Sequence, residues 1–308
     1  MTALSGKNKK SAKARGRKNE FLAYLLLAPV FLLLIVFGFW PPIKGLFYSL
    51  TDYSGGESYN FIWFDNFIEL FKDEQYGIFY ISLLNMVGLT VVGIILGNAM
   101  TLLLAESLHN YRFKKISSGL RFLFMIPALV PGVVVTLIWT KIIFNPTSSG
   151  FMNRILSGVG LGESQWYYSS ETSFISLILT NFPWVGGTSF LIYLAGLQGI
   201  PESVYDAARL DGCGTLRRVF SIDLPMIRGQ IKYFIVMGVI QGLQNFGMQV
   251  ILNQDITNKG LVVPAYYMYS MAFSKGSRFG YASAIGFVIF VFALTMTIIN
   301  NKVVKTED

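Results

Sequence analysis

The sequence predicts an all-α membrane protein with six transmembrane helices and a charged helix-turn-helix between the fourth helix and the fifth. Of the 308 residues, 53% are hydrophobic and only 14% are charged, against about 25% in a soluble domain. The apolar residues gather in long runs that carry almost no charge. Each run is close to the roughly 20 residues that a helix needs to cross a bilayer. Most of the charges fall between the runs.

The chain begins with a basic and polar stretch. Residues 1–19 carry seven lysines and arginines without apolar periodicity, which predicts a disordered tail. The apolar run that follows, residues 21–40, resembles the core of a signal peptide. It is longer than a typical core, however, and no A-x-A cleavage site follows it. We therefore expect an uncleaved first span.

The other apolar runs complete one membrane domain over residues 20–308. Five further stretches are long and apolar enough to cross a bilayer. The predicted spans are residues 21–40, 79–105, 119–143, 173–197, 230–252 and 279–300.

Lysine and arginine predict the orientation of these spans. Eighteen of the 25 fall in the tail, in residues 105–121 and 198–232, and at the C-terminal end. Six spans would place all of these segments on one side, and positive loops are cytoplasmic. Both termini are therefore predicted to be cytoplasmic, and nucleic-acid binding becomes the weaker explanation of the net charge of +8. The outer segments, 45–77 and 145–172, are predicted to anchor at the membrane surface or to dock an extracytoplasmic partner.

The inner segment at 198–229 has the pattern of two helices joined by a glycine turn. Pro201 suits a first helical turn, Gly212 a left-handed helix end, and Thr215 the cap of a second helix. Val204, Ala207 and Ala208 predict a small apolar face on the first helix. Six charges in hydrocarbon would cost about 15–20 kcal/mol, which places the segment outside the bilayer.

Three interpretations of this segment compete. It could be a solvated connector, a helix-turn-helix that reads DNA, or a docking element for a cytoplasmic partner. DNA reading is disfavoured because both flanks are tethered to spans. The residues alone leave the connector and the docking element equally supported.

The same segment resembles the EAA loop of ATP-binding-cassette importer permeases, whose pattern is EAA-x3-G-x9-I-x-LP. Asp206-Ala207-Ala208, Gly212, Ile222 and Leu224-Pro225 fit every spacing, with Asp206 where the family usually has glutamate. "AGLQGIPESVYDAARLDG", "FMIPALVPGVVVTLIWTKIIFNP" and "FGYASAIG" resemble the carbohydrate branch of these permeases. The N-terminal pattern is similar to that of the first permease of a two-permease pair.

The resemblance implies a permease subunit of an oligosaccharide importer in the bacterial cytoplasmic (inner) membrane. It implies four kinds of partner: a second homologous permease, two ATPase subunits, an extracytoplasmic solute-binding protein and the sugar. ATP and Mg²⁺ would bind the ATPases, and this chain has no GxxxxGK[ST] phosphate loop and needs no cofactor. The docking contacts that the resemblance implies are Glu202, Asp206, Ala207, Ala208 and Gly212.

Polar, uncharged residues within the spans are the candidates for substrate binding. In the fifth span, helical spacing predicts one shared face for five residues, including Met248 and Gln249. In the fourth, candidates lie beside Pro183 and Gly186–Gly187. Amides suit sugar hydroxyls and a tryptophan suits a sugar ring, although hydrogen bonding between helices is the alternative. The predicted substrate contacts are Asn181, Trp184, Thr188, Gln241, Gln244 and Asn245.

Other functions stay open on the sequence. Within the importer class, the solute could be a polyol or glycerol phosphate. Outside it, the chain could be a membrane-embedded enzyme or a scaffold, but no catalytic group is evident. Cys213 is the single cysteine, which excludes a disulfide within the chain. Because His109 is the single histidine, a His/Cys metal site is also disfavoured. His109 lies beside Arg112, Lys114 and Lys115, which predicts a basic interfacial face.

Overall fold

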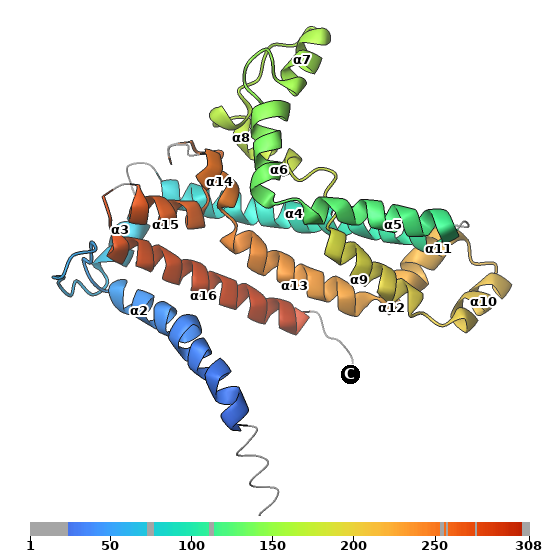
Figure 1. Ribbon diagram of the computed structural model, residues 1–308, viewed down its shortest axis with the longest axis horizontal. Coiled ribbons are helices and arrows are strands. Elements are labelled where there is room, and N and C mark those ends of the chain that lie inside the picture. The colour runs from blue at the N-terminus through green and yellow to red at the C-terminus, as the bar shows by residue number, and fades with distance from the viewer. Residues whose placement is uncertain are drawn as a thin grey trace, which may run out of the picture.

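Long helices that run roughly side by side form most of the computed structural model (Figure 1). The structure describes residues 24–72, 77–110, 114–252, 256, 258–274 and 276–303. Within these ranges it contains helices and one isolated bridge, between Thr51 and Phe61, but no strand. The predictions for the basic tail at 1–19 and for the last five residues lie outside the described part of the chain.

Helix α4 (Ile78–His109) lies at the centre of the bundle. It packs against α9 (Gly187–Gln198), α13 (Arg228–Gln244) and α15 (Pro264–Phe273). Helix α16 (Phe279–Val303) packs on α13 and α15 and also contacts α2 (Trp40–Tyr48). The largest buried cluster, which includes Phe79, Met86 and Ile285, lies where these helices meet at one end of the bundle.

Among the described residues, four helices are long and apolar enough to cross a membrane: Tyr24–Tyr48, Ile78–His109, Arg228–Leu252 and Phe279–Ile299. They correspond to the predicted first, second, fifth and sixth spans. The first helix runs through a π-helical stretch, η1 (Leu34–Phe39), into α2, so it extends eight residues past the predicted end. It has no buried residue in its apolar window and leads away from the bundle (Figure 1).

The predicted third and fourth spans are not continuous helices. The third is divided into α5 (Lys114–Leu129) and α6 (Gly132–Ile138) with η2 (Trp139–Ile143), and the two parts meet at 89°. Pro127 lies inside α5 and Pro131 caps α6, so helical hydrogen bonds are missing at the bend. The fourth is divided into α8 (Ser173–Leu179) and α9 by residues 180–186. By length alone the described residues therefore contain four spans, or five if the bent pair counts as one.

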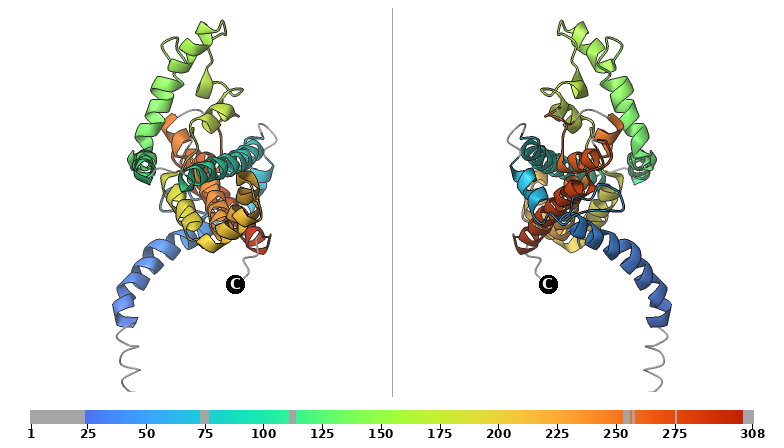
Figure 2. Two further views of the ribbon diagram at one scale, coloured as in Figure 1. Left: turned by 90° about the vertical axis from the view of Figure 1, so that its right-hand side faces the viewer. Right: turned by 90° about the vertical axis from the view of Figure 1, so that its left-hand side faces the viewer.

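A separate lobe stands out from the bundle between these two breaks (Figures 1 and 2). It consists of α6, η2, α7 (Phe151–Gly158), η3 (Trp166–Tyr168) and α8. The buried side chain of Asn153 holds its loops together. Its amide nitrogen donates to the carbonyls of Pro146 and Ser164 at 3.1 Å, and its oxygen accepts from the indole N–H of Trp166 at 2.9 Å. The stacked rings of Phe144 and Trp166 form part of the core beneath.

The loop before α3 (Asp65–Phe71) and α3 itself each contact the start of α16. The backbone N–H of Gly280 donates to the carbonyl of Tyr53 at 2.8 Å. The guanidinium of Arg278 lies 2.5 Å from the carboxylate of Glu69, and this hydrogen bond raises the pKa of Arg278. Both contacts join residues that are far apart in sequence and hold the segment that follows the first span against the start of α16.

The two Gly-x3-Gly pairs, Gly238/Gly242 on α13 and Gly93/Gly97 on α4, meet different surroundings. A Cβ at Gly238 would lie 2.7 Å from Ile94, and a Cβ at Gly242 would lie 2.4 Å from Thr90, so this pair lets α13 approach α4 closely. A Cβ at Gly93 would meet nothing within 4 Å, and one at Gly97 would only reach the carbonyl of Trp184 at 4.0 Å. The spacing is identical, and only the partner surface distinguishes the pairs.

The charged segment at 198–229 forms the predicted helix–turn–helix at the other end of the bundle (Figure 1). Its first helix is α10 (Glu202–Leu210). The second runs through α11 (Thr215–Arg218), the π-helical η4 (Val219–Asp223) and α12 (Leu224–Met226), and α13 follows after Ile227.

Candidate functional site

The fifth span breaks at the candidate polar residues. Helix α13 ends at Gln244, Asn245 has an extended backbone (ψ 122°), and α14 (Gly247–Leu252) starts a new helix. Gln241, Gln244 and Asn245 are exposed, whereas Gln249 is buried and its amide lies 3.5 Å from the carbonyl of Leu261. The prediction of one continuous polar face that includes Gln249 is therefore wrong, because the helical register is lost at Asn245.

The fourth span breaks at the proline and the glycine pair that the sequence singled out. Residues 180–186 leave the helix, and Trp184 has a positive φ of 57°. The indole N–H of Trp184 donates to the carbonyl of Ile178 at 2.9 Å, so it is occupied within the chain. Asn181 makes a long contact of 3.4 Å to the carbonyl of Leu177. Thr188 is exposed on the first turn of α9.

Both breaks lie along one side of α4. Thr90, Ile94, Gly97 and Thr101 follow helical spacing on α4. Thr90 and Ile94 face the glycines of α13, while Gly97 approaches the carbonyl of Trp184 and Thr101 accepts from the N–H of Gly186 at 3.4 Å. Thr90 and Gly97 are seven residues apart, so the two breaks are offset by about 10 Å along the helix axis.

The hydrogen bonds within the chain show which polar side chains of the spans remain available to bind a ligand. Among the described residues, no side-chain hydrogen bond is formed by Gln241, Gln244, Asn245 or Thr188. By contrast, the amide nitrogen of Asn85 donates to the carbonyls of Lys259 and Val262 at 2.7 and 2.8 Å. Three amides and one hydroxyl are thus free to bind a neutral, hydroxyl-rich ligand.

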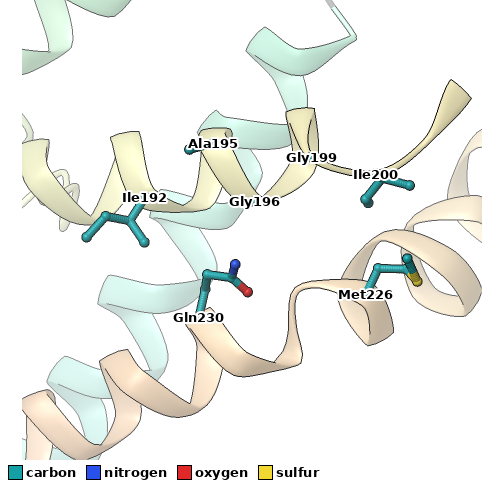
Figure 3. A pocket seen from close by; sticks show the side chains of 7 residues that line it. All are labelled: Ile192, Ala195, Gly196, Gly199, Ile200, Met226 and Gln230. Carbon is teal, nitrogen blue, oxygen red and sulfur yellow. The ribbon is translucent and has the colours of Figure 1, made fainter. Parts of the chain in front are cut away.

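A groove of about 500 Å³ lies between α9 and the α12–α13 junction (Figure 3). The amide of Gln230 projects into it from α13. Gln230 lies on the same side of α13 as Gln241, because eleven residues return an α-helix to within about 20° of its starting direction. Sequence reasoning missed Gln230, although this spacing could have identified it. The groove is lined by Ile192, Ala195, Gly196, Gly199, Ile200, Met226 and Gln230.

The turn of the charged segment has the predicted geometry. Gly212 is left-handed with φ 67°. The N–H of Cys213 donates to the carbonyl of Ala208 at 2.9 Å, and that of Gly212 donates to the carbonyl of Arg209 at 3.1 Å, which is the Schellman pattern. The second helix is capped by Gly214 without a side-chain bond, so the predicted Thr215 cap is wrong. Gly214 has the extended backbone (φ -70°, ψ 161°) that an N-cap residue requires, so it takes the cap position in place of Thr215.

The side chains of α10 divide between two faces. Glu202, Asp206 and Ala207 are exposed, and Arg209 lies 3.0 Å from Asp206 and 3.7 Å from Glu202. Ala208, however, is only 7% exposed and packs inside the chain. The predicted single face of Ala207 and Ala208 is therefore split, because successive residues on a helix point about 100° apart.

A buried charge cluster links this segment to α4. Arg218 Nε donates to Asp223 at 2.9 Å, and its Nη2 donates to Asn110 at 2.7 Å and lies 3.7 Å from Glu106. The guanidinium also lies over the ring of Tyr205, 5.4 Å from its centroid. Burial raises the pKa of the Tyr205 hydroxyl, and the Asp223 carboxylate acts in the same direction. Tyr205 therefore stays protonated.

His109 also joins this cluster, with its ring 5.8 Å from that of Tyr205. The predicted basic face of His109 with Arg112, Lys114 and Lys115 concerns side chains outside the described residues. In the part of the chain that the structure describes, no group of three or more His, Cys, Asp or Glu side chains is placed to hold a metal ion.

Comparison with known proteins identifies the family. The model of the binding-protein-dependent transport system inner membrane component matches residues 90–306. The chain is 30% identical over 292 residues to the probable ABC transporter permease protein YurN of Bacillus subtilis (strain 168), covering 94% of this chain and 98% of that protein. It is 28% identical over 317 residues to the diacetylchitobiose uptake system permease protein NgcF of Streptomyces coelicolor, covering 97% and 87%.

A solved structure agrees with these relatives. A chain in the crystal structure of a bacterial alginate ABC transporter in complex with an alginate pentasaccharide-bound periplasmic protein has a TM-score of 0.80 and 25% identity. The match covers 94% of this chain and 95% of that chain. The chain therefore belongs to the family of binding-protein-dependent transport system inner membrane components.

Proposed function

We propose that this chain is a permease subunit of an ATP-driven oligosaccharide importer in the bacterial cytoplasmic membrane. The observation that carries the proposal is the set of free amides, Gln241, Gln244 and Asn245, at the break of the fifth span. A broken helix at depth in a membrane is tolerated only where it lines a cavity or is buried in protein. Relatives named for diacetylchitobiose uptake and alginate transport support a carbohydrate as the solute.

The arrangement of the two breaks favours a sugar of more than one ring. The break of the fourth span carries Asn181, Trp184 and Thr188. It contacts α4 about 10 Å along the helix axis from Thr90, which is where α13 of the fifth span packs. A single sugar ring is shorter than this offset, whereas an oligosaccharide bridges it. The candidate residues are all uncharged, which suits hydroxyl groups. Glycerol phosphate, the rival solute, is an anion and would call for a cationic side chain at the same place.

The remaining parts of the importer come from other chains. We assign ATP and Mg²⁺ to two ATPase subunits, because this sequence has no phosphate loop. Glu202, Asp206, Ala207 and Gly212 present the docking surface on α10 and its turn, and Ala208 supports it from inside. The exposed first helix, Tyr24–Tyr48, needs lipid or a second permease to cover it. A solute-binding protein delivers the sugar from outside.

The proposal keeps six crossings, with 119–143 and 173–197 as bent or broken ones, and both termini in the cytoplasm. To test this, Cys213 is replaced by serine and single cysteines are placed at exposed positions. Ser58→Cys and Ser157→Cys should react with a membrane-impermeant maleimide in intact cells, because both lie in predicted outer segments. Ser203→Cys on α10 should react only after the membrane is opened. Labelling of Ser203→Cys in intact cells would reverse the orientation.

The substrate site is tested by removing one amide at a time. Gln244→Leu and Asn245→Leu should each weaken sugar uptake by about 2- to 10-fold, since a lost hydrogen bond is worth about 0.5–1.5 kcal/mol. Assembly should survive, because neither side chain bonds to a described residue. The measurement is uptake of radiolabelled diacetylchitobiose into proteoliposomes that contain the assembled importer.

Gln249→Leu is the matched control. Its amide is buried against the carbonyl of Leu261, so we expect a loss of stability with unchanged apparent affinity. Unchanged uptake in both Gln244→Leu and Asn245→Leu, or lost assembly in both, would show that these amides are not sugar contacts. Transport of glycerol 3-phosphate in preference to sugars would favour the rival solute. Failure to recover any ATPase or second permease with the wild-type chain would favour a membrane enzyme or a scaffold.

A further inference from the structure

The buried charge cluster around Arg218 connects two parts of the chain that are distant in sequence. Arg218 and Asp223 belong to the second helix of the charged segment, while Glu106 and Asn110 lie at the end of α4. Asp223 is completely buried, and the side chains of Arg218 and Glu106 are 20% and 11% exposed. Charges shielded from water to this degree interact much more strongly than surface pairs.

Arginine provides the geometry that this cluster needs. Its Nε reaches Asp223 at 2.9 Å while Nη2 reaches Asn110 at 2.7 Å, so one planar group bonds two elements at once. Asn110 in turn donates to the carboxylate of Glu106 at 3.2 Å. Tyr205 of α10 lies under the guanidinium, so both helices of the charged segment are attached to α4 through one side chain.

Helix α4 reaches from this cluster to the candidate substrate site. It is a single α-helix of 32 residues, Ile78–His109. Its inner end holds the cluster, and its stripe of Thr90, Ile94, Gly97 and Thr101 contacts both helix breaks. A displacement of the charged segment would therefore be carried along α4 to the polar residues at the breaks.

We propose that Arg218 is a positioning residue that clamps the docking segment to α4, so that both move as one body when the ATPases close. The inference rests on the proposed function, because it takes α10 as the ATPase-docking helix. The segment is already joined to the bundle by the chain at residues 199–201 and at Ile227, and Arg218 adds a non-covalent connection to these two links. Arg218 touches neither the sugar nor the nucleotide and acts through Asp223, Asn110 and Glu106.

The test measures a distance within this chain in the assembled importer. Spin labels are placed on α10 at Ser203 and on the outer half of α4 at Leu84, both exposed, in a Cys213→Ser background. Double electron–electron resonance is recorded in nanodiscs before and after trapping with Mg²⁺-ATP and vanadate. In the wild type we expect the same distance in both states. In Arg218→Gln/Asp223→Asn, which avoids leaving an unpaired Asp223, the distance should shift or broaden on trapping.

Two further variants make the result specific. Arg217→Gln removes the neighbouring, exposed arginine and should behave as wild type. Arg218→Lys keeps the charge but loses the planar fork whose Nε and Nη2 reach Asp223 and Asn110, so it should show the shift without a change in net charge. Both Arg218 variants should retain ATPase subunits at the wild-type ratio.

The outcomes separate this inference from the function beneath it. A wild-type distance that changes on trapping, or Arg218 variants that match the wild type, would overturn the clamp while docking stands. Loss of ATPase binding in both Arg218 variants, with Arg217→Gln normal, would also overturn it, because Arg218 would then shape the docking surface. Absence of ATPase subunits from the wild-type complex would instead contradict the proposed docking function.

Discussion

The Ala207→Trp variant is expected to lose ATP-driven uptake while the chain still folds and inserts. Ala207 is exposed on α10 next to Asp206 of the docking surface, so a bulky ring there can extend away from this chain. Against a fitted partner cleft, overpacking costs about 1–3 kcal/mol or more. We expect the ATPase subunits to be lost on co-purification from detergent, or to hydrolyse ATP without sugar uptake.

Ala208→Trp is the matched control for this prediction. Ala208 is only 7% exposed and packs inside the chain, so a ring at this position should lower the melting temperature of the permease itself. The two neighbouring substitutions thus separate docking from folding. Normal ATPase binding and uptake in Ala207→Trp would mean that α10 is a solvated connector.

The Gly280→Ala variant is expected to destabilise the end of the bundle where α16 begins. A Cβ at this position would lie 2.1 Å from the carbonyl oxygen of Thr51 and 3.1 Å from that of Tyr48. Both neighbours are backbone atoms, so no side-chain rotation relieves the overlap. The shift would also strain the hydrogen bond from Gly280 to Tyr53. We expect a loss of about 3 kcal/mol, the upper end of the usual overpacking cost.

Thermal unfolding in detergent, followed by tryptophan fluorescence, measures this effect. Gly119→Ala is the control, because a Cβ there meets nothing within 4 Å and Gly119 lies inside α5. Alanine is a better helix former than glycine by about 1 kcal/mol, so this variant should unfold at the same or a higher temperature. Equal stability of Gly280→Ala and Gly119→Ala would contradict the close approach of Gly280 to the backbone of Thr51.

Several features could be read from local sequence because local chemistry decides them. Gly212 marks a left-handed helix end, and the structure gives it a φ of 67°. The pair Gly186–Gly187 and Pro183 mark a helix break, and the fourth span breaks there. The first, second, fifth and sixth spans follow from apolar runs, whose length is a property of the sequence.

Other features depended on which surface each residue meets. Ala207 and Ala208 are chemically identical, yet only Ala208 is buried, because it shares with Tyr205 the side of α10 that faces the rest of the chain. Asn245 and Asn85 both place an amide side chain in an apolar run. Only the fold shows that the amide of Asn85 donates a hydrogen bond to the backbone carbonyl of Lys259. The cluster of Arg218, Asp223 and Glu106 joins residues more than a hundred positions apart, a separation at which sequence spacing carries no information.

The sequence by itself determined the class of the protein, its apolar spans and the helix-turn-helix, because hydrophobic length, charge placement and backbone preference act over a few residues. Only the tertiary structure decided where the helices break relative to one another, which amides stay free and which glycines allow close approach. These three features depend on packing between segments that are distant in sequence. There, the neighbouring segment decides whether a side chain is exposed or buried, and the chemistry of the side chain alone does not.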